Sequence, residues 1–262
     1  MKHVAMKSTW LAALLSAALC GASATLGAQA STATTTPTAE QLAARRQQSA
    51  DSMLHNDWAN LERYRAANAA LPAPAAGEAR VVFMGNSITD GWARLFPTAF
   101  PGKPYIGRGI SGQTTPQMLV RFRADVVALH PKVVVILAGT NDIAGNTGPS
   151  TLEMIEDSFM SMVQIAKAHH IRVVLSSVLP VYDYPWKPGL APAPKIIALN
   201  AWLKRYASET GEIYLDYHTA MADSRGGLPP NLARDGVHPT EDGYRIMAPL
   251  AEDAIARALR AP

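Results

Sequence analysis

The sequence predicts an α/β fold with a parallel β-sheet at its centre. Short apolar runs alternate with stretches of helical spacing, and each run is apolar at successive positions, as in strands buried on both faces. The length of 262 residues suits one large α/β domain or two small ones. We expect strands at 80–84, 104–106, 132–138, 171–175 and 212–216, and helices near 116–129, 151–169, 195–209 and 241–259.

The strand candidates differ in strength. The run from Val133 to Leu137 is the strongest, because five aliphatic residues follow one another. The run Pro104-Tyr105-Ile106 is the weakest. A parallel sheet of this kind binds its ligands at the carboxyl ends of its strands, so residues that follow these runs are the first candidates for a site.

Residues 1–30 resemble a secretory signal peptide. Lys2 and Lys7 are basic, Trp10–Cys20 is apolar, and Ala28-Gln29-Ala30 fits a cleavage site. A membrane anchor is the first alternative, although the apolar run is shorter than a span needs. A lipoprotein signal is the second alternative, because a cysteine, Cys20, stands at the end of that run. We expect a periplasmic or secreted protein without a stable membrane anchor, whose mature chain has no cysteine.

The segment between the leader and the first strand divides in two. Residues 31–39 are rich in Ser, Thr and Ala and are expected to form a flexible linker. Residues 40–77 are expected to be a helical extension, with an amphipathic helix over 40–70 whose Trp58 and Tyr64 pack in the core. The main domain is then predicted to span 78–262.

Composition excludes several classes of protein. Hydrophobic residues make up 48% of the chain, enough to build a core, which excludes a disordered protein. The formal net charge is +3, and two of the basic residues lie in the predicted leader. Because no run of Lys or Arg offers a phosphate-binding patch, no nucleic-acid partner is expected.

Four short blocks of polar residues and glycine lie at positions that a parallel sheet would bring to one edge. Together they supply a hydroxyl, a glycine N–H, an amide and an Asp/His pair, which are the parts of acyl transfer by a serine nucleophile. The blocks are Gly85-Asn86-Ser87, Gly109-Ile110-Ser111-Gly112, Gly139-Thr140-Asn141-Asp142 and Asp235-Gly236-Val237-His238.

Each block has an expected role. Ser87 is the candidate nucleophile, His238 the base that takes its proton, and Asp235 the carboxylate that orients the imidazole. The backbone N–H groups of Ser87 and Gly112 and the side-chain amide of Asn141 are the candidate donors to the oxyanion. Any one of these signals is weak by itself, and the ordered set of four is specific.

Two other readings of the polar residues remain open. His218 follows Asp216 by two residues at another strand end, so this pair could supply the base instead. The loop 180–194 is rich in proline and carries Tyr184 and Trp186, which either bind substrate or pack the loop onto the domain. Metal-ligand spacings, phosphate-binding glycine loops and the Gly-x-Ser-x-Gly elbow are absent from the sequence, so no metal or cofactor is expected.

The four blocks, in this order, resemble those of the SGNH hydrolases, also called the GDSL esterase/lipase family, over roughly residues 78–260. The resemblance implies a flavodoxin-like three-layer α/β/α sandwich with a five-stranded parallel sheet. It also implies a Ser87–His238–Asp235 triad and an oxyanion hole from Ser87, Gly112 and Asn141. One departure is Asn86, where the family usually has Asp.

The sequence around the first block is most similar to the branch that resembles platelet-activating-factor acetylhydrolases and bacterial carbohydrate acetylesterases. We therefore expect a serine esterase that removes short acyl groups, above all acetyl, from a small-molecule or oligosaccharide ester. A lysophospholipase or thioesterase for longer chains is the alternative within enzymes. A carbohydrate-binding module that lost its chemistry is the alternative outside them.

Overall fold

The computed structural model describes residues 38–260. Its contacts divide the chain into residues 1–44 and residues 45–262. Of the first unit only 38–44 are described, and these include the start of helix α1 (Ala39–Asn56). The predicted signal peptide and nearly all of the predicted linker lie outside the described residues. Within 38–260, no helix has both the length and the apolar character needed to cross a membrane.

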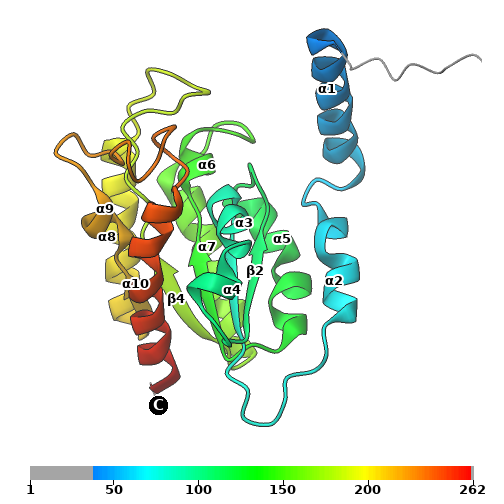
Figure 1. Ribbon diagram of the computed structural model, residues 1–262, viewed down its shortest axis with the longest axis vertical. Coiled ribbons are helices and arrows are strands. Elements are labelled where there is room, and N and C mark those ends of the chain that lie inside the picture. The colour runs from blue at the N-terminus through cyan, green and yellow to red at the C-terminus, as the bar shows by residue number, and fades with distance from the viewer. Residues whose placement is uncertain (1–37, 261–262) are drawn as a thin grey trace, which may run out of the picture. The chain divides into compact units, whose positions relative to one another are not determined.

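Five parallel strands form one sheet at the centre of the second unit (Figure 1). The order β2-β1-β3-β4-β5 is that of flavodoxin-like folds, as predicted. The run at 104–106, the weakest of the predicted strands, is a full strand that extends to Gly109 and pairs with β1. The strands are β1 (Val81–Gly85), β2 (Tyr105–Gly109), β3 (Val133–Leu137), β4 (Arg172–Ser176) and β5 (Ile213–Leu215).

Helices cover both faces of the sheet. Successive side chains of a strand point to opposite faces, so Val82 and Met84 join one apolar cluster while Val81 and Phe83 join the other. The first cluster includes α5 (Thr115–Asp125), α7 (Leu152–Ala168) and α8 (Ala193–Thr210). The second includes α3 (Ser87–Ala93), α4 (Phe96–Ala99), α9 (Tyr217–Met221) and α10 (Glu241–Arg260). The predicted three-layer α/β/α sandwich is therefore confirmed.

Helix α10 is bound to helix α3 across the second layer. The Tyr244 ring stacks on the Trp92 ring with centroids 5.5 Å apart, and the Tyr244 hydroxyl donates to the carbonyl of Ile88 at 2.8 Å. Because Ser87 begins α3 and His238 lies shortly before α10, this contact helps to set the distance between the two residues.

The N-terminal segment is not the single amphipathic helix that the spacing predicts. Helix α1 ends at Asn56, and the chain resumes as a 3₁₀ turn at Leu61–Tyr64 and a short helix, α2 (Arg65–Ala70). The Asp57 carboxylate accepts hydrogen bonds from the N–H groups of Leu61 and Glu62, and Asn60 has a left-handed backbone with φ of 52°. This side-chain cap starts a new turn in a different direction.

The segment after Asp57 is attached to the domain by buried polar contacts. Tyr64 is 8% exposed and donates its hydroxyl proton to the carbonyl of Gly109. The Asn68 amide donates to the Asp125 carboxylate at 2.7 Å. Tyr64 is thus buried as expected, but Trp58 is partly exposed, so the expectation that it packs in the core is wrong.

Candidate active site

The residues of the four blocks gather where the strands end. Ser87 begins α3 directly after β1, Gly112 lies in the loop after β2, and Asn141 lies in α6 (Thr140–Ile143) after β3. Asp235 and His238 lie in the loop before α10. Because the strands are parallel, all of these connections leave the sheet at the same edge.

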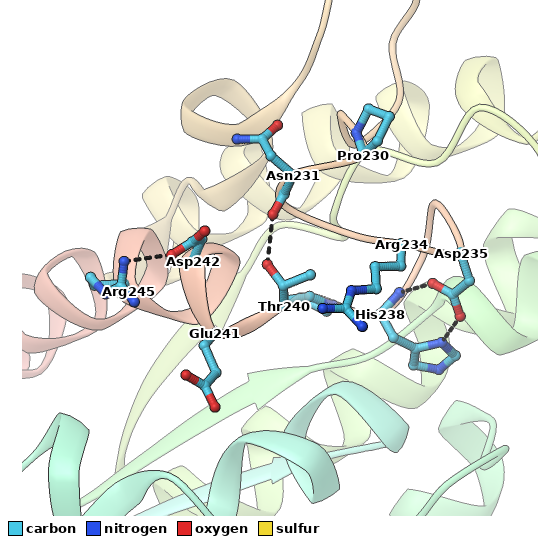
Figure 2. Close-up of a pocket in the computed structure, with 10 residues that line it drawn as sticks. Pro230, Asn231, Arg234, Asp235, His238, Thr240, Glu241, Asp242 and Arg245 are labelled. Atoms are coloured by element: carbon cyan, nitrogen blue, oxygen red, sulfur yellow. Dashed lines mark hydrogen bonds and ion pairs between the residues drawn. The ribbon is translucent and has the colours of Figure 1, made fainter.

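Ser87, His238 and Asp235 form a continuous chain of hydrogen bonds. The Ser87 Oγ lies 2.9 Å from Nε2 of His238, and Nδ1 of His238 lies 2.6 Å from Oδ2 of Asp235. Figure 2 shows the Asp235 carboxylate beside both the ring and the backbone N–H of His238. With Nδ1 protonated and bound to the carboxylate, Nε2 is left as an acceptor for the serine proton.

The Asp235 carboxylate is held in its ionised form. Partial burial raises its pKa, but the N–H groups of His238 and Val237 and the His238 ring hydrogen-bond the charged form and lower the pKa more. The two backbone bonds measure 2.8 and 3.0 Å. The net result is a pKa below the usual value for Asp, which keeps a negative charge beside the imidazole.

Local packing presents Ser87 at the end of β1. The Asn86 side chain caps α3 by accepting from the N–H of Ile88 at 3.3 Å, so the acceptor role of the usual Asp is retained. Helix α3 approaches β2 so closely that a Cβ on Gly109 would lie 2.1 Å from the backbone nitrogen of Asp90. Only glycine permits this approach.

The two other candidate oxyanion donors, Gly112 and Asn141, both depend on the loop after β2. The Asn141 amide is 3% exposed and donates one proton to the carbonyl of Gln113 at 2.9 Å. Gly112, the residue before Gln113, is exposed and has φ of 80°, a conformation that favours glycine. Since an amide nitrogen carries two protons, this bond uses only one of those of Asn141.

A buried arginine, Arg121, supports the loop after β2 through hydrogen bonds. Arg121 is fully buried, and its guanidinium donates to the carbonyls of Gly85 and Arg108, to the side chain of Gln113 and to the Asp125 carboxylate, at 2.6 to 3.0 Å. It therefore joins the end of β1 to the end of β2 and to the loop beyond. Sequence reasoning missed Arg121; the signal was a charged pair four residues apart on the core-facing side of a predicted helix.

The Asp142 carboxyl joins α6 to the start of α5. It is 2% exposed and accepts from the backbone N–H and the hydroxyl of Thr115 at 2.9 and 2.6 Å. Burial raises its pKa above the usual value, and the bonds from Thr115 offset part of that rise. Asp142 thus helps to fix the backbone of its neighbour Asn141.

Comparison with known proteins assigns the family. The model of the GDSL-like lipase/acylhydrolase family matches residues 83–246. The chain belongs to this family. It is a carboxylic ester hydrolase, and its matched region contains Ser87, Gly112, Asn141, Asp235 and His238.

Three individual proteins illustrate what the chain is similar to. A candidate acylhydrolase from Bacteroides fragilis is 50% identical with a TM-score of 0.76, over 78% of this chain and 100% of that one. An acetylxylan esterase of Geobacillus stearothermophilus is 27% identical over 203 residues, or 64% of this chain and 90% of the relative. The lipoprotein YqeF of Bacillus subtilis is 28% identical over 96 residues, which cover 35% of this chain and 40% of that protein.

The structure weakens the alternative base in this GDSL-like enzyme. The Asp216 carboxylate caps α9 by accepting from the backbone N–H and the hydroxyl of Thr219 at 2.9 and 2.8 Å. Burial lowers the pKa of His218, against the opposing effect of the Asp216 charge. Asp216 therefore serves the helix, whereas Asp235 faces an imidazole that also contacts Ser87.

The loop 180–194 brings one aromatic residue to the site and buries another. Tyr184 is fully buried, and its hydroxyl bonds to the hydroxyl and carbonyl of Thr140 at 2.9 Å. The expectation that Tyr184 offers its face to a substrate is therefore not met. Trp186 is 45% exposed, with its ring centroid 6.2 Å from that of His238 and 5.0 Å from that of Tyr184. Part of the loop thus borders the site.

An open cavity of about 820 Å³ adjoins His238 (Figure 2). Its lining combines polar and apolar surface and includes the charged side chains of Arg234, Glu241 and Arg245.

Proposed function

We propose that this enzyme is an exported serine esterase that hydrolyses short acyl esters, above all acetyl esters, of carbohydrates. Ser87 is the nucleophile, His238 the general base and Asp235 the carboxylate that orients the imidazole. The observation that carries this proposal is the chain of contacts at 2.9 and 2.6 Å from serine through histidine to aspartate.

The proposed reaction has two halves. In the first, Ser87 Oγ attacks the ester carbonyl and its proton passes to Nε2 of His238; the tetrahedral oxyanion then accepts from the N–H groups of Ser87 and Gly112 and from the Asn141 amide. Collapse of this intermediate breaks the bond to the alcohol, which leaves with the proton from Nε2. In the second half a water molecule gives a proton to Nε2 of His238 and attacks the acyl carbon. Collapse of this intermediate breaks the bond to Ser87 Oγ, which takes the proton back from Nε2, and the carboxylic acid is released.

Two observations support a carbohydrate as the alcohol. The departing oxygen takes its proton from His238, so the alcohol must lie beside that residue, where a cavity with charged side chains in its lining opens. Trp186 is exposed next to the same imidazole and offers a ring face on which a sugar could stack. The similarity to an acetylxylan esterase supports an acetyl group on such a sugar.

Export is part of the proposal. The basic and apolar residues of 1–30 support a cleaved leader, and the similarity to a bacterial lipoprotein is compatible with it. Mass spectrometry of the protein recovered from periplasm or medium tests this point. A mature N-terminus near residue 31 is expected, and an intact leader would contradict it.

The substrate proposal is tested with p-nitrophenyl esters from acetyl to decanoyl. We expect kcat/KM to be highest for acetyl or propionyl esters and low for octanoyl. In an open apolar groove each added methylene would instead favour binding by up to ~0.8 kcal/mol, so a rise toward decanoyl would support a lysophospholipase or thioesterase.

A nucleophile variant provides the control for that series. Ser87→Ala should lose about 10⁶ in rate, because the catalytic group acts as a unit. A purified variant that kept more than about a tenth of the wild-type rate would contradict the nucleophile assignment. A wild-type protein without turnover that still bound oligosaccharide would indicate a binding module.

A further inference from the structure

A second cavity, of about 480 Å³, begins at the candidate oxyanion hole. It includes Gly112 in its lining and extends to Trp58, in the segment ahead of the sheet. Other residues that line it are Arg63, Asp90, Ile110 and Asn146. An acetyl group is far too small to fill this volume, which lies within the usual range of ~300–1,000 Å³ for ligand pockets.

The segment that carries Trp58 is fixed to the loop of the oxyanion hole. The Gln117 side chain donates to the carbonyl of Trp58 at 2.7 Å, and the Gln113 side chain donates to the carbonyl of Ala59 at 2.7 Å. The same Gln113 accepts from Arg121 and, through its backbone carbonyl, orients Asn141. The backbone that carries the indole is therefore held at a set position relative to the loop of Gly112 and Gln113.

The lining is mostly apolar, with Leu54, Trp58 and Ile110 among its side chains, and polar groups stand between them. Arg63 and Asp90 form an ion pair at 3.6 Å, and the Ser111 hydroxyl donates to Asp90 at 3.0 Å. The Asn146 amide donates to the carbonyl of Gly112 at 3.3 Å. An aliphatic acyl chain could cover the apolar part of the wall, but it would strip water from these charges and amides without replacing its hydrogen bonds.

A sugar ring matches this lining. The C–H face of a pyranose can stack on an indole, while the hydroxyls at its rim can bond amides, carboxylates and guanidinium groups. We propose that the cavity between Gly112 and Trp58 binds a sugar unit of the oligosaccharide next to the one that carries the scissile ester. The inference rests on the proposed function, because it assumes a carbohydrate ester at Ser87.

The test compares three acetyl esters: p-nitrophenyl acetate, an acetylated methyl xyloside and an acetylated xylotetraose. Wild-type enzyme should show a higher kcat/KM on the tetrasaccharide than on the monosaccharide. Trp58→Ala should lose about tenfold more on the tetrasaccharide than on the aryl acetate, the size of effect expected for one lost ring contact. Trp58→Phe, which keeps a ring, should recover most of that loss.

A second tryptophan provides the matched control. Trp202 lies on α8, is partly exposed and stacks on Tyr206 with centroids 4.8 Å apart. Trp202→Ala should change the rates on the three esters by the same factor. Circular dichroism of each variant separates a folding defect, which lowers all three rates together, from loss of a sugar contact.

The outcomes separate this inference from the proposed function. A wild-type enzyme that cleaves the aryl acetate but neither sugar ester contradicts the carbohydrate substrate, and the inference with it. A wild-type enzyme that cleaves both sugar esters equally well, or a Trp58→Ala loss that is equal on all three, overturns the inference alone. A Trp58→Ala loss that grows with acyl length on aryl esters would assign the cavity to the acyl chain and overturn it too.

Discussion

The Asn141→Ala substitution separates an oxyanion donor from a structural asparagine. One amide proton of Asn141 is used by the carbonyl of Gln113 at 2.9 Å, which leaves one for the substrate. Loss of a single oxyanion donor costs ~2.7–4 kcal/mol of transition-state stabilisation, so kcat should fall about 10²–10³-fold. KM should change much less, because the donor acts mainly when negative charge develops on the carbonyl oxygen.

The same truncation also affects stability. Gln113 is 3% exposed, so its carbonyl would be left buried without this donor, at a cost of about 1–3 kcal/mol. For a domain of this size each kcal/mol lowers Tm by roughly 2–4 °C. Rates should therefore be measured well below the melting temperature of the variant.

Asn200→Ala provides the matched control. Asn200 is 7% exposed and makes two hydrogen bonds to the backbone of Val178, at 2.7 and 2.9 Å. The variant should lose at least as much stability as Asn141→Ala while its kcat stays close to wild type. Initial rates on p-nitrophenyl acetate and thermal melts by circular dichroism measure both quantities. If Asn141→Ala retained more than a tenth of wild-type kcat, or changed KM alone, the oxyanion assignment would be refuted.

The remaining predictions concern the base, the buried arginine and metals. His238→Ala should lose nearly as much as the serine variant and His218→Ala little; the reverse result would exchange their roles. Arg121→Met should destabilise the protein by about 3–5 kcal/mol, because the buried Asp125 carboxylate loses its ion pair, and an unchanged urea midpoint would disprove this. EDTA should leave the activity unaffected, and inhibition that zinc reverses would show otherwise.

The sequence by itself determined the order of elements and the position of each candidate residue along them. Every expected strand is present, because five apolar runs separated by helical stretches leave a parallel sheet as the way to bury both faces. The edge at which Ser87, Asn141 and His238 meet follows from the same reasoning. That Ser87 and Asp235 both lie within hydrogen-bonding reach of His238 is a finding of the structure, and the catalytic role of these residues stays a prediction.

Only the tertiary structure decided what each side chain touches. Spacing alone placed Trp58 and Tyr64 on one helix face, whereas the Asp57 cap breaks that helix and separates their environments. For Tyr184 the sequence leaves open substrate binding and packing of the loop, and the bond from its hydroxyl to Thr140, 44 residues away in the chain, decides for packing. Arg121 likewise has partners on two strands. These contacts depend on which distant segments pack together, whereas a local pattern records only which face of an element is apolar.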